Sequence, residues 1–322
     1  MTMNEVSVYR QVGICTLLHL LVDGLCICSL YLLSSSLPLP SLAAIFITYN
    51  TLAFLTQPLT GAWADRMERK HWMLIMAVLL LTLAVASTLF AVLAQWSSLS
   101  VTVVPILLGL GNSLFHVWGG RQVAVKTGND MRALGLFVST GAFGLAIGYV
   151  FFSWALLCAM LLMISLLAVA YLHLDLSSQV ENQGVVMERR LGVVLVVACL
   201  FALMAFVMFR SFIGESFSSG VPKGNLWVLA AGIVAMLGKM AGGWIARRIG
   251  IVRAFALVLT VVAVCLIYRD AGVATLLVGL FAMNCTMPVT LYLANAVLPG
   301  REGLAFGLLA AALMPGYLLA SL

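Results

Sequence analysis

Long apolar runs dominate the chain, and short polar stretches separate them. A helix that crosses a bilayer needs roughly 20 mostly apolar residues, and most of the runs reach that length. The pattern therefore predicts an all-α integral membrane protein. It predicts eleven spans, at 11–33, 41–61, 72–94, 99–119, 132–150, 153–173, 191–211, 226–245, 249–268, 272–294 and 303–322.

The longest polar stretch between spans is LDLSSQVENQGVVMERR, residues 174–190. It separates six predicted spans from five. This division predicts an N-terminal six-helix half at 1–174, a cytoplasmic linker at 175–190 and a C-terminal five-helix half at 191–322.

Composition excludes the soluble classes of protein. The chain is 63% hydrophobic and 9% charged, whereas soluble domains carry about 25% charged residues. The net charge of +6 comes from small basic clusters beside the apolar runs, so nucleic acid is not an expected partner. The seven cysteines lie inside apolar runs without metal-ligand spacing. The chain also lacks a phosphate-binding glycine loop or a catalytic set, so we expect no metal, no cofactor and no enzymatic activity.

The distribution of Lys and Arg predicts the orientation. Loops that face the cytoplasm carry the excess of basic residues, and placing the N-terminus there collects almost all of them on one side. Lys223 and Arg269 alone fall outside. We therefore expect a cytoplasmic N-terminus and, with eleven spans, an external C-terminus. The inner residues are Arg10, Arg66, Arg69, Lys70, Arg121, Lys126, Arg132, Arg189, Arg190, Arg247, Arg248, Arg253 and Arg301.

A short repeat supports the division into halves. GAWADR at 61–66 recurs as GWIARR at 243–248, and both share the pattern G-x-x-A-x-R. Each copy lies at the cytoplasmic end of the second span of its half. Duplicated halves are typical of secondary transporters.

The stretch GAWADRMERK, residues 61–70, resembles the G-x-x-x-D-R-x-G-R-[RK] loop between helices 2 and 3 of the major facilitator superfamily, with Glu68 in place of glycine. Further stretches resemble the fosmidomycin-resistance branch of drug exporters. They are HLLVD (19–23), TQPLTGAWADR (56–66), GLGNSLFHVWGGRQVA (109–124), FVSTGAFGLAIG (137–148) and VLPGREGLAFGLL (297–309). The resemblance implies a two-half helical bundle in which this chain lacks the twelfth helix.

The resemblance also implies a conformational latch. Asp65 would join an arginine near the end of the fourth helix, here Arg121, and the start of the helix near Gly303. The alternative is that the charges only fix the topology. The second copy of the motif has Arg247 at the aspartate position, which argues against a symmetric latch. The latch candidates are Gly61, Asp65, Arg66, Arg69, Lys70 and Arg121.

His19 and Asp23 lie four residues apart, on one face of the first predicted span. Ionisable side chains at membrane depth are costly and usually face a partner or a water-filled path. The pair is therefore the candidate for proton coupling. The alternative is a neutral packing pair without a role in transport.

Three further residues are candidates for substrate contact or coupling: His116, Trp118 and Arg210. Relatives in the resembled branch carry Pro-Glu directly after this histidine, whereas this chain has Val117 and Trp118. Three polar residues, Arg210 among them, lie near predicted span ends, where long side chains can reach the membrane interface. They are Arg210, Glu215 and Lys239.

Small residues in the fifth predicted span favour close helix packing. They are Gly141, Gly144 and Gly148. The corresponding motif of antiporters has a Gly-Pro pair, whereas Tyr149 follows Gly148 here.

The sequence as a whole predicts a multi-pass secondary transporter of a bacterial inner membrane, acting as a monomer. We expect proton-coupled efflux of a small drug-like or anionic molecule by alternating access. The alternatives are a facilitator or importer of a small metabolite, or a transport-dead truncated membrane protein.

Overall fold

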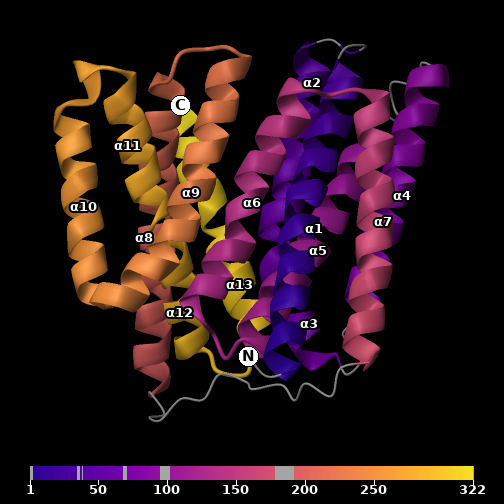
Figure 1. Ribbon diagram of the computed structural model, residues 1–322. Coiled ribbons are helices and arrows are strands. Elements are labelled where there is room, and N and C mark those ends of the chain that lie inside the picture. The colour runs from indigo at the N-terminus through magenta and orange to yellow at the C-terminus, as the bar shows by residue number, and fades with distance from the viewer. Residues whose placement is uncertain are drawn as a thin grey trace.

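The computed structural model describes residues 3–34, 37, 39–67, 71–94, 102–177 and 192–321. In these residues the chain is helical throughout, without strands (Figure 1). The helices of the first half are α1 (Met3–Ser34), α2 (Leu39–Asn50), η1 (Thr51–Leu55), α3 (Gln57–Arg66), α4 (His71–Ala94), α5 (Val104–Lys126), α6 (Met131–Val150) and α7 (Trp154–Ser177). Those of the second half are α8 (Val193–Gly220), α9 (Asn225–Ile249), α10 (Ile251–Ile267), η3 (Arg269–Ala271), α11 (Val273–Asn284), α12 (Met287–Val297), α13 (Glu302–Ala311) and α14 (Leu313–Ser321).

Nine helical segments among the described residues are long and apolar enough to cross a membrane. Helix α5, with 23 residues, and the shorter apolar helix α10, with 17, lie beside them. The predicted all-α membrane bundle is thus confirmed. The N and C marks lie at opposite ends of the bundle (Figure 1).

Three of the spans are interrupted just before a proline. Segments α2, η1 and α3 form one span from Pro40 to Arg66 with Pro58 at the start of α3, while Pro288 and Pro315 lie at the starts of α12 and α14. Proline lacks the N–H that would bond to the carbonyl four residues earlier. The preceding turn therefore loosens, and each span bends.

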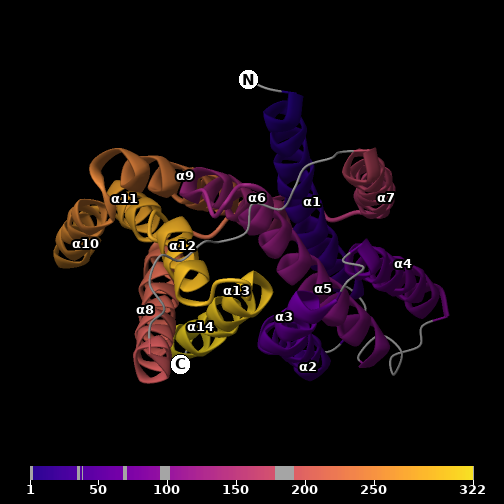
Figure 2. The same ribbon diagram turned by 90° about the horizontal axis from the view of Figure 1, so that it is seen from below.

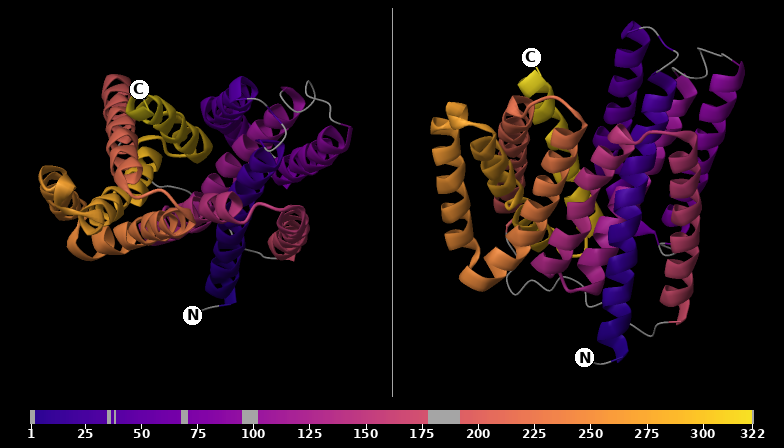
Figure 3. Two further views of the ribbon diagram at one scale, coloured as in Figure 1. Left: turned by 90° about the horizontal axis from the view of Figure 1, so that it is seen from above. Right: turned by 45° about the horizontal axis from the view of Figure 1, so that its top comes forward.

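The two halves stand side by side, with α1–α7 on one side and α8–α14 on the other (Figures 1 and 3). They meet where α6 packs on α9 and α12, and where α13 packs on α3 and α5 (Figure 2). A large apolar core fills the first half and continues into α12 and α13, and a second core lies inside the other half.

Several helix boundaries differ from the sequence-based prediction. Helix α8 ends at Gly220, whereas the predicted span ended at 211. The prediction stopped too early because the apolar pattern ends at the polar run SFIGESFSSG, which is still helical. Helix α5 begins at Val104 and runs to Lys126, instead of 99–119. Helix α7 runs to Ser177, so the predicted linker begins within a helix, and residues 178–190 lie outside the described part of the chain.

Candidate functional site

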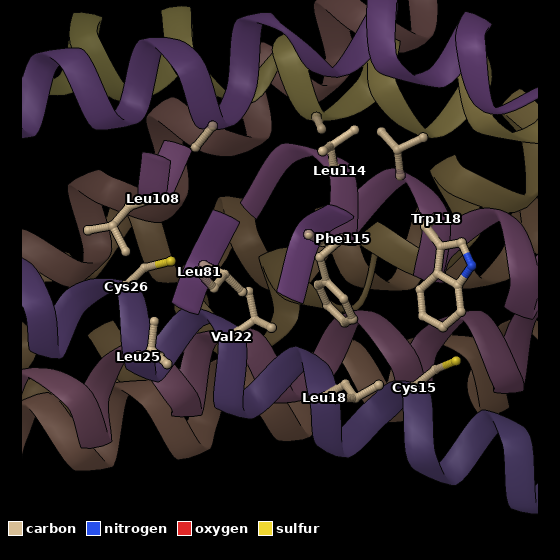
Figure 4. Packing of buried hydrophobic residues seen from close by; sticks show 14 of the residues in the cluster. Cys15, Leu18, Val22, Leu25, Cys26, Leu81, Leu108, Leu114, Phe115 and Trp118 are labelled. Carbon is tan, nitrogen blue, oxygen red and sulfur yellow. The ribbon is translucent and has the colours of Figure 1, made fainter. Parts of the chain in front are cut away.

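Three ionisable side chains meet between α1 and α5. His19 and Asp23, on one face of α1, point at His116 of α5. His19 is 5% exposed and Asp23 is 8% exposed. The surrounding contacts between the two helices are apolar, and include Leu18 and Val22 (Figure 4). The group, which we call the His–Asp cluster, is thus closed in by packed helices.

Backbone carbonyls fix the tautomers of both histidines. Nδ1 of His19 lies 2.7 Å from the carbonyl oxygen of Phe137, and Nδ1 of His116 lies 2.9 Å from that of Asn112. A carbonyl oxygen only accepts hydrogen bonds. Each Nδ1 therefore carries a hydrogen and donates it, which leaves a lone pair on each Nε2 when the ring is neutral.

Those two Nε2 atoms face each other at 2.8 Å. Each also lies 3.4 Å from a carboxylate oxygen of Asp23. With both rings neutral, lone pairs alone would meet at this point. One additional proton converts the N···N contact into a hydrogen bond, and the carboxylate balances its charge. The three side chains thus leave room for one proton between the two Nε2 atoms.

The same donor set lacks the geometry of a metal site. The ligand atoms of His19, Asp23 and His116 all lie within 4.8 Å of one another. Zinc is bound tetrahedrally at about 2.0–2.1 Å, which separates ligand atoms by roughly 3.3 Å. The N···N distance of 2.8 Å is that of a hydrogen bond. The arrangement therefore does not fit a metal ion.

Asn112 orients the carboxylate. Its Nδ2 donates to Oδ1 of Asp23 at 2.9 Å, and it lies one helical turn before His116 on the same face of α5. The sequence analysis missed Asn112. Its spacing from His116 in the stretch GNSLFH was the signal that points to it.

Helix α6 closes the cluster from a third side. A Cβ at Gly141 would collide with the side chains of Asp23 and His19, and one at Gly144 or Gly148 would collide with the backbone of α1. Thr140 donates to the carbonyl oxygen of Thr16 at 2.7 Å. The glycines therefore let α6 lie directly against α1 at the level of the cluster.

The predicted latch residues Asp65 and Arg121 form an ion pair between α3 and α5. Helix α3 lies at the end of the bundle that carries the N mark (Figure 1). The Nε of Arg121 donates to Asp65 at 3.0 Å. The backbone N–H groups of Gly303 and Leu304, at the start of α13, donate to the two carboxylate oxygens at 2.9 Å each. A carboxylate satisfies the free N–H groups at a helix N-terminus and its positive dipole end. Asp65 thus ties the first half to the second.

Gly61 permits this contact, because a Cβ there would collide with the carbonyl of Gly303. Arg66 is exposed and takes no part in the bonds to Asp65. Arg69 and Lys70 lie outside the described residues.

The second motif copy packs against the start of α6. A Cβ at Gly243 would collide with the carbonyl of Met131, and the guanidinium of Arg132 lies 5.2 Å from the centre of the Trp244 ring. Asp130 caps α6 by accepting from the backbone N–H of Arg132 at 2.9 Å. The carboxylate of Asp130 therefore lies at the start of α6. Arg247, from the second motif copy, interacts with this carboxylate through its charge. Each copy of the motif thus lies against the start of a helix of the other half, with Asp65 in the first copy and the oppositely charged Arg247 in the second.

Partial burial alone would raise the pKa of the Asp130 carboxyl. The hydrogen bonds from Arg132 and the charges of Arg132 and Arg247 outweigh this effect and hold the pKa below its usual value.

A further contact between the halves was not predicted. Nδ2 of Asn295 donates to Oδ1 of Asn129 at 2.8 Å, and Nδ2 of Asn129 donates to the carbonyl oxygen of Tyr292 at 3.0 Å. Asn129 has a positive φ of 63°, a backbone conformation that asparagine tolerates better than most residues. The residues are far apart in sequence, so no local pattern could have paired them.

Arg210 does not reach a membrane interface. It lies more than two turns inside α8 and is 6% exposed, and its Nε has no hydrogen-bond partner among the described residues. The interpretation of Arg210 as a snorkelling residue was wrong because α8 continues past the predicted end. Lys239 lies near the middle of α9, and its charge interacts with Arg210, Asp23 and His116. Glu215 is half-buried on α8.

Trp118 is not brought to the cluster. It is buried against Tyr171 of α7, with ring centres 4.8 Å apart, and its ring centre lies 6.1 Å from that of Phe115 in the apolar core (Figure 4). This is the position of a packing residue.

The comparison with protein families decides the identity of the fold. Residues 12–321 match the model of the Major Facilitator Superfamily. The chain belongs to this superfamily. It is therefore a transporter that lies in the lipid bilayer. Members of this family bind small molecules and are typically not enzymes.

Solved structures of this superfamily share the fold. The E. coli fucose:proton symporter has a TM-score of 0.72 at 14% identity, covering 98% of this chain and 90% of that one. A second structure of the same symporter, in the outward conformation, gives the same score and identity, with 98% and 91% covered. A bacterial homologue of the iron transporter ferroportin, in its outward-facing state, has a TM-score of 0.66 at 15% identity, with 97% and 91% covered. No curated protein sequence matches the chain.

Proposed function

We propose that this protein is a proton-coupled secondary transporter and that the His–Asp cluster is its coupling site. The observation that carries the proposal is the pair of Nε2 atoms of His19 and His116, 2.8 Å apart, beside the carboxylate of Asp23. With one proton the cluster is neutral overall. Without it, the cluster carries a negative charge and opposed lone pairs. Proton release thus changes which arrangement of α1, α5 and α6 is favoured.

The Asp65 latch supplies the second part of an alternating-access cycle. It holds the two halves together at the end of the bundle that carries the N-terminus. With that end in the cytoplasm, as the basic residues indicate, the structure corresponds to a transporter closed toward the cytoplasm. Opening the latch would expose the cluster to the cytoplasm and let the proton leave.

We propose export as the first direction, because the motifs resemble those of the fosmidomycin-resistance branch. In this cycle protons enter in exchange for a small drug-like or anionic molecule, in a bacterial inner membrane. One charge moved through 100 mV supplies about 2.3 kcal/mol, which supports a substrate gradient of roughly 40-fold. A single proton per cycle is enough for useful efflux.

Uptake together with protons is the second candidate, and the observation that favours it is the pair Arg210 and Lys239. The charge of Lys239 interacts with Asp23 and His116 of the cluster and with Arg210, and neither cation has an ion-pair partner within 4 Å among the described residues. An anion bound to them would attract the proton instead of displacing it.

The test uses the full chain reconstituted in vesicles that contain a pH-sensitive dye. Benzoate, phenylphosphonate, benzamide and benzylamine serve as probes, and a probe that moves protons is then used with Asp23→Asn. We expect this variant to lose proton movement and to keep exchange of the labelled probe without a gradient. Asp270→Asn, at an exposed side chain, is the matched control.

The direction of proton movement during probe transport separates export by exchange from uptake. Proton movement by Asp23→Asn equal to that of the parent protein at every pH would contradict the coupling site. A parent protein that moves no probe would favour the transport-dead alternative.

A further inference from the structure

The second half of the molecule carries two cations away from exposed helix ends. Arg210 of α8 is 6% exposed, and Lys239 of α9 is half-buried. Their charges interact with each other, and Lys239 also interacts with Asp23 and His116. The residues of both halves are thus parts of one electrostatic site.

Neither cation has an ion-pair partner in the described part of the chain. No carboxylate of the described residues lies within ion-pair distance of Arg210 or Lys239, and the Nε of Arg210 is buried without a hydrogen-bond partner. Asp23 is already engaged by Asn112 and the two histidines. Glu215 lies five residues after Arg210, on another face of α8.

An unpaired charge at this depth is costly. A guanidinium does not lose its proton in proteins, and a buried charge normally has a partner. Two like charges within interaction range add repulsion to that cost. A bound anion would remove both terms at once, because the planar guanidinium suits an oxyanion and the ammonium supplies a second charge.

We propose that Arg210 and Lys239 bind the oxyanion group of a small organic anion, a carboxylate or a phosphonate, as the transported substrate. This inference rests on the proposed transport function and names its substrate class. The anion would lie between the two halves, with its charge toward α8 and α9 and within electrostatic range of the cluster on α1 and α5.

The position has a consequence for the direction of coupling. A bound anion and a proton on the His–Asp cluster attract each other, so they bind to the same state. A carrier that holds both in one state moves them in the same direction. An organic anion at this site therefore favours the second candidate of the proposed function, uptake with protons. Export by exchange would favour a neutral or cationic substrate.

The test compares four probes of similar shape and different charge. Benzoate and phenylphosphonate are anions, benzamide is neutral, and benzylamine is a cation at neutral pH. Binding to the purified full chain in lipid nanodiscs is measured by calorimetry. We expect at least one anion to bind about tenfold or more tightly than benzamide and benzylamine, as charge-assisted hydrogen bonds do.

The variants assign that binding to the two cations. Arg210→Gln and Lys239→Gln should each weaken anion binding by about tenfold or more. Arg210→Lys, which keeps the charge, should recover part of it, and Lys223→Gln at an exposed lysine is the control. Because Arg210→Gln removes an unpaired buried charge, we expect it to raise the thermal unfolding midpoint. A merely structural role of Arg210 would lower it.

The outcomes distinguish this inference from the coupling site. Equal or tighter binding of benzamide or benzylamine, or anion binding that survives both glutamine variants, would overturn the anion site. Binding of none of the four probes would overturn it as well. Proton-driven transport of the neutral probe would overturn the anion site while supporting the cluster. If an anion binds but the Asp23→Asn variant pumps like the parent, the anion site is supported and the cluster is overturned as the coupling site.

Discussion

The backbone N–H of Gly303 donates to the carboxylate of Asp65 at 2.9 Å, although the two residues belong to different halves of the transporter. The same carboxylate accepts from Leu304 and from Arg121. A single side chain thus caps a helix of the second half and forms a buried ion pair within the first. Rocking of the halves against each other must break the cap.

Asp65→Asn tests this relationship. Asparagine keeps the shape but loses the charge that holds Arg121 and the positive end of α13, so we expect the balance of conformations to shift by about 1 to 3 kcal/mol. Transport should fall while ligand binding is largely retained. Distances between spin labels on α3 and α13 measure the shift, with Asp270→Asn as the control. Lost binding with unchanged distances would count against a latch.

Asn129→Gly tests the second contact between the halves. Glycine adopts the positive φ of this position without strain, so the change removes only the bonds to Asn295 and Tyr292. Two neutral hydrogen bonds contribute about 1 to 3 kcal/mol. We expect a shift toward separation of the halves at this end, measured by spin-label distances between α5 and α12. If the variant shows the same spin-label distances as the parent protein, the contact does not hold the halves together.

Gly144→Val tests the approach of α6 to α1. The first added carbon would collide with the backbone carbonyl of Leu20, so we expect a loss of about 1 to 3 kcal/mol in the free energy of unfolding. Thermal unfolding in detergent measures it. Gly214→Ala is the control, because a Cβ at Gly214 meets nothing within 4 Å and alanine favours a helix by about 1 kcal/mol. Equal stability of the two variants would contradict the packing.

Asp130→Asn tests the charge at the start of α6 through its pH dependence. The pKa of Asp130 is lowered in the folded protein, so its charge stabilises the fold above the unfolded pKa of about 4. That stabilisation is lost as the pH falls through the lowered folded pKa.

We therefore expect Asp130→Asn to be less stable than the parent by about 0.5 to 1 kcal/mol at neutral pH. The difference should shrink below pH 4, measured by thermal unfolding at several pH values. A difference that is the same at pH 7 and pH 3 would show that the charge of Asp130 does not stabilise the helix.

The sequence was sufficient for the bundle because span length and apolarity are local properties. Its weakest point was the end of α8, where a polar run still forms helix. Because of that error, Arg210 was predicted to lie near a membrane interface, whereas it is buried inside the bundle. Hydropathy measures the average environment of a segment, whereas the burial of one residue depends on which helix covers it.

The candidate site was predictable only in parts. The spacing of His19 and Asp23 placed them on one face of α1, but nothing local joined that face to His116. The contact arises because the glycines of α6 let this helix pack closely against α1, and α5 covers the remaining side. Asn129 and Asn295 likewise meet only through the packing of the halves.

The central claim is that His19 and His116 share one excess proton, and ¹⁵N NMR of the ring nitrogens tests it most directly. The chain has four histidines, so uniform ¹⁵N-histidine labelling and single His→Gln variants suffice for assignment. We predict that both Nδ1 atoms carry a hydrogen and that a single proton is shared by the two Nε2 atoms, with a coupling across the N···N hydrogen bond. Finding a neutral ring with its hydrogen on Nε2 and a bare Nδ1, at either histidine, would contradict the account.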